Sequence, residues 1–245
     1  MMTKPPQRAH GTLALTVLFL VACGPPTPSS GGGSSRDVGV AAQPDGGVEQ
    51  PGEDAGTTER PDAGAAPCAW PTDNLGVGVG QRVPSELNWQ GYGAGDEQER
   101  TISIREFYDC DGRQGVHGVL LITSQYGCSR CNSQASGLTQ MIESWAQEGL
   151  NIKVLTLKIE DSDGSKPASM EGAGHWRDTY GLSNSAVAFD NGYTMIPRTG
   201  GGSMRFGTPL NSVIDPRTME VIDVIQTFDR SYGSLLELAR RRAAE

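Results

Sequence analysis

Four consecutive residues, Cys128-Ser129-Arg130-Cys131, have the spacing of a reactive dithiol. They lie between an apolar run and a stretch with helical periodicity, which predicts a junction from strand to helix. The free N–H groups and the dipole of a helix N-terminus stabilise a thiolate and can lower a cysteine pKa from about 8.5 to roughly 3.5–7.5. We therefore expect Cys128 to attack a disulfide and Cys131, one turn later, to resolve the mixed disulfide.

Two other interpretations apply to a CxxC. A zinc site needs more ligands, but the sequence has no second CxxC or Cys-His pair, and its histidines are His10, His117 and His175. The other interpretation, an inert structural disulfide, stays open. We predict neither a metal site nor a cofactor.

The three remaining cysteines are Cys23, Cys68 and Cys110. Cysteines of an exported domain are normally paired in an oxidising compartment. With Cys23 set aside as a lipidation site, Cys68 and Cys110 are left for each other, as a disulfide that holds the N-terminal segment of the domain. Two free thiols are the alternative.

The N-terminal residues have the composition of an export signal. Lys4 and Arg8 precede a short apolar run, 11–22, which is too short for a permanent membrane span. The run ends in Leu-Val-Ala-Cys at position 23 and resembles the lipobox of bacterial lipoproteins, in which the cysteine is acylated. We expect a signal peptide over 1–22 and a lipid anchor at Cys23; an ordinary cleaved signal peptide is the alternative.

Residues 23–67 are rich in Gly, Pro, Ser, Ala and acidic residues and have no aromatic residue. Such a segment buries too little apolar surface to offset its conformational entropy, so we expect a disordered linker. Gly24 after the lipidation site favours the outer membrane by analogy with known lipoproteins. The expected location is the bacterial cell envelope, facing the periplasm or the surface.

The charge of the chain is acidic. The formal net charge is −9, and removal of Lys4 and Arg8 leaves 18 basic and 29 acidic residues, a charge of −11. This balance argues against nucleic acid or anionic lipid as a binding partner. We expect a monomeric domain at 68–245, held at the membrane only by its lipid.

The folded part alternates strands and helices. Strands are predicted over 101–108, 116–123, 151–159, 186–189, 210–214 and 219–225, and helices over 133–147, 170–180 and 234–243. This order predicts an α/β sandwich with a mixed central sheet, flanking helices and an N-terminal extension. The Gly-rich segment 191–207 is predicted as a loop over the reactive edge.

Several motifs together resemble the thioredoxin superfamily, most of all its TlpA-like and redoxin thiol–disulfide proteins. They are the Gly-x-x-x-Pro segment 80–84, the strand–CxxC–helix, the segment 176–191, and the segment 207–215 with Pro209. The resemblance covers about residues 78–245. It implies a thioredoxin-like fold, a cis peptide bond before Pro209 beside Cys128, and a Thr208 backbone that contacts the substrate peptide. The implied activity is disulfide exchange with exported proteins and an unidentified redox partner.

The chain departs from this family at two positions. Gly127 replaces the usual Trp before the first cysteine, and Gln134 replaces a carboxylate that relatives use as a proton relay. A peroxiredoxin is a weaker alternative, because Gln125 stands where the peroxidatic pattern has Thr. The remaining alternatives are a copper-handling protein, with His117 or His175 as an added ligand, and a non-catalytic binding lipoprotein.

Overall fold

The computed structural model describes residues 68–161, 164, 166–198, 206–228 and 231–245. The chain divides into two units, Met1–Arg60 and Pro61–Glu245, and the fold described here belongs to the second. The predicted signal peptide over 1–22, the lipidation site at Cys23 and the linker over 23–67 lie outside the described residues. Within the described parts, no helix combines the length and the apolar character needed to cross a membrane.

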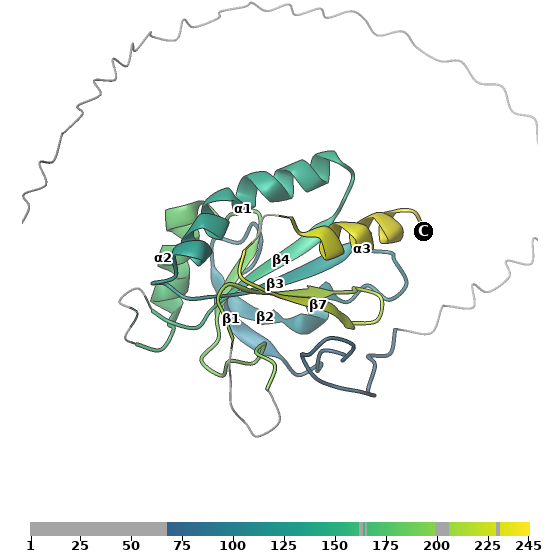
Figure 1. Cartoon of the computed structure of the whole chain (residues 1–245), viewed down its shortest axis with the longest axis horizontal. Coiled ribbons are helices and arrows are strands. Elements are labelled where there is room, and N and C mark those ends of the chain that lie inside the picture. The colour runs from purple at the N-terminus through teal and green to yellow at the C-terminus, as the bar shows by residue number, and fades with distance from the viewer. Residues whose placement is uncertain (1–67, 162–163, 165, 199–205, 229–230) are drawn as a thin grey trace, which may run out of the picture. The chain divides into compact units, whose positions relative to one another are not determined.

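Strands and helices alternate after an N-terminal hairpin (Figure 1). In chain order the elements are β1 (Asn88–Tyr92), β2 (Glu99–Ser103), the 3-10 helix η1 (Ile104–Phe107), β3 (Gly118–Ser124), α1 (Ser129–Gln147), β4 (Ile152–Lys158), α2 (Met170–Tyr180), β5 (Ala186–Phe189), β6 (Leu210–Ile214), β7 (Val221–Gln226) and α3 (Gly233–Ala243).

The seven strands of the described residues form one mixed sheet in the order β2-β1-β5-β4-β3-β6-β7. Strands β3, β4 and β5 run parallel, whereas β6 runs antiparallel to β3 and β7 antiparallel to β6. The hairpin β1–β2 extends the sheet beyond β5 through antiparallel pairing. Every residue of β3 is buried, as expected for a central strand covered on both faces.

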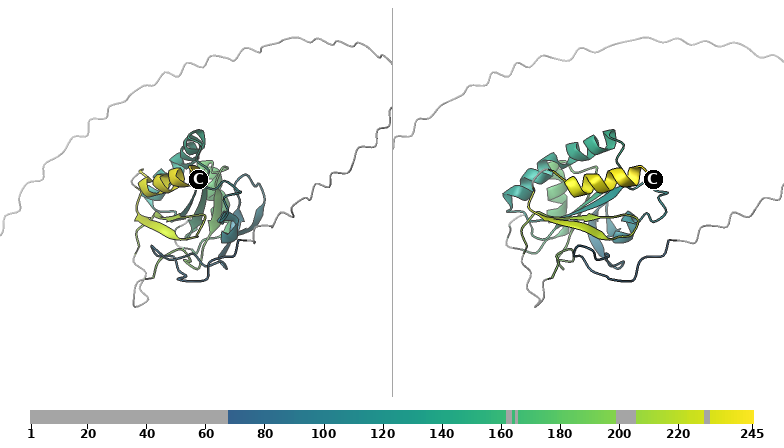
Figure 2. Two further views of the ribbon diagram at one scale, coloured as in Figure 1. Left: turned by 90° about the vertical axis from the view of Figure 1, so that its right-hand side faces the viewer. Right: turned by 45° about the vertical axis from the view of Figure 1, so that its right-hand side comes forward.

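The alternation of side chains along the strands builds two cores. Leu120 and Ile122 of β3 point into a cluster that also contains buried residues of all three helices. Val119 and Leu121 point to the other face, into a cluster that contains Ile104 of η1. Helices α1 and α3 lie side by side over one face of the sheet (Figure 2).

The sequence analysis missed β1 and extended β2 too far. The sequence analysis predicted no element before residue 101. Strand β1 needs glycine at position 91, because a Cβ there would collide with the Val187 carbonyl of β5. The predicted strand 101–108 ends at Ser103, where a capping box begins η1: Ser103 Oγ accepts from Arg105 N at 3.3 Å, and Glu106 Oε1 accepts from Ser103 N at 2.8 Å. The Ser-x-x-Glu spacing is a signal that could have identified this turn.

The other predicted elements are present with small shifts at their ends. Helix α1 begins at Ser129, four residues earlier than predicted, because Cys128 caps it. Strand β7 begins at Val221, because Met219 has a φ of 56° and closes the turn from Asp215 with a 2.7 Å hydrogen bond to its carbonyl. The mixed sheet, the helices around it and the element order confirm the predicted thioredoxin-like α/β fold.

Candidate functional site

The two cysteines of the CxxC lie at the start of α1, directly after the central strand β3. They form a disulfide with a Cα–Cα distance of 5.2 Å. Cys128 is the N-cap residue with extended φ and ψ, and its Sγ accepts a 3.1 Å hydrogen bond from Cys131 N. The sulfur of Cys128 therefore receives an N–H group at the positive end of a 19-residue helix.

The two sulfurs differ in their access to solvent. Cys128 is partly exposed, whereas Cys131 is only 1% exposed and belongs to the core cluster beneath α1. A protein substrate can therefore reach Cys128 and not Cys131. This arrangement fits an attacking first cysteine and a resolving second cysteine.

The segment before β6 lies against the CxxC. The peptide bond between Thr208 and Pro209 is cis. Leu210, the next residue, pairs with Thr123 near the end of β3. The carbonyl oxygen of Thr208 lies 3.4 Å from Cys128 Sγ. One end of the sheet thus brings together two segments that are far apart in sequence, Cys128–Cys131 and Thr208–Pro209.

Gln125 links the Thr208 segment to the end of β4. Its Oε1 accepts a 2.6 Å hydrogen bond from Thr208 Oγ1, and its Nε2 donates to Glu160 Oε1 at 2.5 Å. The sequence analysis noted Gln125 only as a departure from the peroxiredoxin pattern. Its position three residues before Cys128, in the loop after a buried strand, was the available signal.

The two departures from the thioredoxin pattern have different structural settings. Gly127 is exposed, and a Cβ at this position would meet nothing within 4 Å, so the absent Trp leaves the approach to Cys128 open. Gln134 is 1% exposed and donates from Nε2 to Asn211 Oδ1 at 2.7 Å and to Tyr232 OH at 2.5 Å. A neutral amide with two hydrogen-bonded partners thus occupies the position for which the family resemblance implied an acid.

A buried lysine lies on the same face of the sheet as the CxxC. Lys158, the last residue of β4, is 0% exposed, and its Nζ lies 3.3 Å from the centre of the Trp176 ring. Desolvation lowers the pKa of Lys158 to about 7, and Glu160 partly opposes this change. The sequence analysis missed this residue, although a lysine at an inward position of an apolar strand was visible in the pattern.

The two described histidines, His117 and His175, do not complete a metal site with the CxxC cysteines. His117 precedes β3 and accepts at Nδ1 from Asn151 N at 3.0 Å, whereas the CxxC follows β3, about 20 Å away along a seven-residue strand. His175 lies in the middle of α2 rather than at its start, is exposed, and places Nε2 3.2 Å from Tyr126 OH. Among the residues that the structure describes, no group of three or more His, Cys, Asp or Glu side chains could hold a metal ion.

The second disulfide, Cys68–Cys110, holds the N-terminal segment at the opposite end of β3, with a Cα–Cα distance of 5.9 Å. Tyr108 adds two contacts to that segment. Its OH donates to Ala69 O at 2.8 Å, and its ring lies 4.8 Å from the ring of Trp70. The start of the domain is therefore fixed by covalent, polar and aromatic contacts.

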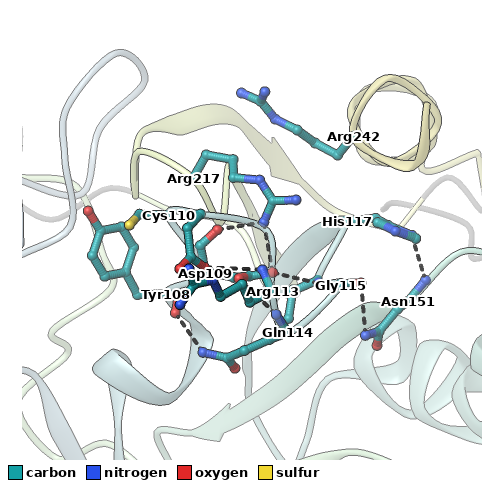
Figure 3. A network of polar contacts seen from close by, with 12 residues as sticks. Tyr108, Asp109, Cys110, Arg113, Gln114, Gly115, His117, Asn151, Arg217 and Arg242 are labelled. Atoms are coloured by element: carbon teal, nitrogen blue, oxygen red, sulfur yellow. Dashed lines mark hydrogen bonds and ion pairs between the residues drawn. The ribbon is translucent and has the colours of Figure 1, made fainter. Parts of the chain in front are cut away.

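Asp109, next to this disulfide, is the centre of a polar network (Figure 3). Its carboxylate accepts from Gln114 N at 3.1 Å and Val116 N at 2.9 Å, and it pairs with Arg217 at 2.7 Å. Burial raises the pKa of Asp109, but these three donors together outweigh that effect and hold the pKa below its ordinary value. The network ties the loop before β3 to the turn between β6 and β7.

The predicted loop 191–207 is described only in part. Residues 191–198 and 206–207 form neither helix nor strand, as predicted, and 199–205 lie outside the described residues.

No protein-family model and no curated protein sequence matches the chain. Several solved structures are similar to it. A protein from Chlorobium tepidum assigned as the thiol:disulfide interchange protein DsbE is 18% identical, with a TM-score of 0.46, and the match covers 68% of this chain and 99% of that one. The thioredoxin domain of a thiol–disulfide oxidoreductase from Bacteroides vulgatus is 13% identical (TM-score 0.45; 66% and 98% covered). A 2-Cys peroxiredoxin from Plasmodium vivax is 16% identical (TM-score 0.43; 68% and 80% covered).

At identities this low, the similarity is limited to the arrangement of helices and strands. The chain has a thioredoxin-like fold with a CxxC at the N-terminus of its first long helix. What this site does must be inferred from its own residues.

Proposed function

We propose that this chain is a thiol–disulfide oxidoreductase that exchanges disulfides with exported proteins through Cys128 and Cys131. The observation that carries the proposal is the setting of Cys128: a partly exposed sulfur at a helix N-terminus, 3.4 Å from the Thr208 carbonyl beside a cis-proline. Cys128 attacks, Cys131 resolves, and the Thr208–Pro209 backbone binds the substrate as an added extended segment.

The rest of the proposal concerns where the domain works. A signal peptide over 1–22, a lipid anchor at Cys23 and a linker over 23–67 would place the domain 68–245 in the cell envelope, with the outer membrane as the favoured site. The sequence motifs described above support this architecture. The paired cysteines Cys68 and Cys110 support an oxidising compartment.

The experiment is trapping of mixed disulfides in a bacterial host that exports the full chain. With Cys131→Ser, the resolving step is lost, so disulfide-linked complexes with exported proteins should accumulate on non-reducing gels. The matched control Cys128→Ser should trap none. Addition of Cys23→Ser to the trapping variant should move the complexes from the membrane fraction to the soluble fraction.

Two results would contradict the proposal. Equal trapping by both variants would show non-specific oxidation, and trapping by neither, together with no dithiol exchange by the wild-type domain, would indicate a binding module. Complexes that stay with the membrane after Cys23→Ser would contradict the lipid anchor alone.

A further inference from the structure

Lys158 is placed beside the redox centre by the sheet. It pairs with Ser124 in the parallel register of β3 and β4, and Ile159 N donates to Ser124 O at 3.1 Å. The chain continues from Ser124 through Gln125, Tyr126 and Gly127 to Cys128. Lys158 therefore lies at the end of the sheet from which the CxxC loop leaves.

The side chain of Lys158 points to the same face of the sheet as the redox cysteines. Alternation along β4 puts it on the side of Ile152 and Val154, which belong to the core cluster of Cys131. Two aromatic rings surround its amine: Nζ lies 3.3 Å from the centre of Trp176 and 5.8 Å from the centre of Tyr126.

The amine is buried without a hydrogen-bonding partner among the described residues. On the same side of the sheet, the hydroxyl of Thr156 and the indole N–H of Trp176 also lack partners within those residues. A buried amine that lies against two ring faces and has no hydrogen-bond partner among the described residues is destabilised when charged. A nearby negative charge would stabilise the charged form of the amine.

The redox centre can supply that charge. Tyr126 forms one wall around the amine and stands two residues before Cys128, so their Cα atoms are at most about 7.6 Å apart. Trp176, the other wall, shares a core cluster with Cys131, and both Tyr126 and Cys128 pack against that cluster. Lys158 and the two cysteines are thus next to residues of one core cluster.

Few other charged groups face the amine. Glu160, two residues after the end of β4, lowers the cost of the charge on Lys158, and its carboxylate accepts a hydrogen bond from Gln125 Nε2. From α2 come His175, which is exposed and lies against Tyr126 OH, and Tyr180, whose ring packs on Trp176. From the end of β5, Asp190 binds the Lys158 carbonyl through its backbone N, while its carboxylate accepts from Thr194.

We propose that the buried amine of Lys158 is the internal proton acceptor of this redox centre and that its charge stabilises the Cys128 thiolate. The proposal rests on the disulfide-exchange function proposed above. An external dithiol supplies two electrons and two protons and becomes a disulfide. The Cys128–Cys131 bond breaks, Cys131 takes one proton as a thiol, Lys158 takes the other, and Cys128 remains a thiolate.

The size of the coupling follows from Coulomb's law. Two unit charges roughly 10 Å apart, in a medium with an effective dielectric constant of about 20, change each other's acid dissociation constant by about tenfold. The coupling is reciprocal, so the thiolate raises the proton affinity of Lys158 by the same factor. Because the pKa of Lys158 in the disulfide form is about 7, its proton uptake on reduction falls between about pH 7 and pH 8.

The experiment compares the full chain with Lys158→Met and with the control Lys153→Met, a change at an exposed lysine on the same strand. Thiolate absorbance at 240 nm gives the Cys128 pKa, and equilibration with dithiothreitol buffers gives the reduction potential from pH 6 to 9. Lys158→Met should weaken Cys128 as an acid about tenfold and lower the potential by about 30 mV. It should also lose about half a proton from the uptake between pH 7 and 8, so its potential should change with pH by about 15 mV per pH unit less than that of the wild-type protein.

The control should match the wild-type protein in every measurement. Equal Cys128 pKa values and equal slopes for Lys158→Met and wild type would overturn the inference. If Lys158→Met does not fold, the wild-type protein decides: a thiolate formed below pH 7 with uptake of about one and a half protons per disulfide near pH 7.5 supports the inference, and uptake of one overturns it. If the protein traps mixed disulfides but Lys158→Met has no effect on the Cys128 pKa or the slope, this inference alone is overturned. If Lys158→Met changes the Cys128 pKa but the protein exchanges no disulfides, only the proposed function is overturned.

Discussion

Replacement of Lys158 by methionine is expected to stabilise the oxidised protein, most strongly at and below neutral pH. The side chain is 0% exposed, and its pKa is about 7 instead of the ordinary 10.5. That difference corresponds to a free-energy cost of about 5 kcal/mol for the fully charged buried amine. Methionine has a similar length, no charge and favourable contacts with aromatic rings, so we expect a gain of about 4 kcal/mol at pH 7, where half of the amine is already neutral.

The gain should depend on pH in a defined direction. The unfolded chain keeps the Lys158 proton up to about pH 10, whereas the folded protein releases it near pH 7. Between these values the unfolded state binds more protons, so the free energy of unfolding of the wild-type protein rises with pH. The advantage of Lys158→Met should therefore shrink by about 2 kcal/mol between pH 7 and pH 9.

Urea unfolding at pH 7, 8 and 9, followed by fluorescence and by circular dichroism, measures this difference. Lys153→Met is the control, since it removes an exposed lysine from the same strand and should leave the wild-type profile unchanged. A constant difference between Lys158→Met and wild type across this range would refute the reasoning, because it would mean that the ammonium group of the folded protein is solvated.

Two further predictions concern stability. Loss of the second disulfide through the double change Cys68→Ala and Cys110→Ala frees a loop with a sequence separation of 42 residues, so thermal and urea unfolding should show a loss of about 4 kcal/mol; unchanged stability would contradict its structural role. Gln134→Glu places a carboxylate in a buried site and raises its pKa, so the free energy of unfolding should fall by about 2 kcal/mol between pH 5 and pH 7.5, while the exposed control Gln140→Glu should show no such fall.

The sequence predicted those helices and strands whose local residue pattern matches their burial and packing in the folded protein. Strand β3 is an apolar run buried on both faces, and α2 ends at Gly181, whose left-handed conformation closes the helix as glycine commonly does. Strand β1 could not be predicted in this way. Its Gly91 is disfavoured in an isolated strand and is required only because β5 approaches closely.

The features of the candidate site also divide into those that the sequence predicted and those that it did not. The spacing and the strand–helix junction predicted the roles proposed for Cys128 and Cys131, because local sequence decides where a helix begins. The link from Gln125 to Thr208 and Glu160 joins three segments of the chain, and no local pattern contains it. The burial of Lys158 depends on Trp176, which lies on a helix that packs there only after folding.

The position of the Cys68–Cys110 disulfide has a practical consequence. Cys68 is fixed near the beginning of β3, whereas Cys128 follows the end of that strand, about 20 Å away. A solid support, fluorescent protein or affinity tag joined before Cys68 is therefore attached at the far end of the domain from Cys128. Immobilised or fused in this way, the protein should present its reactive thiol to large partners without obstruction.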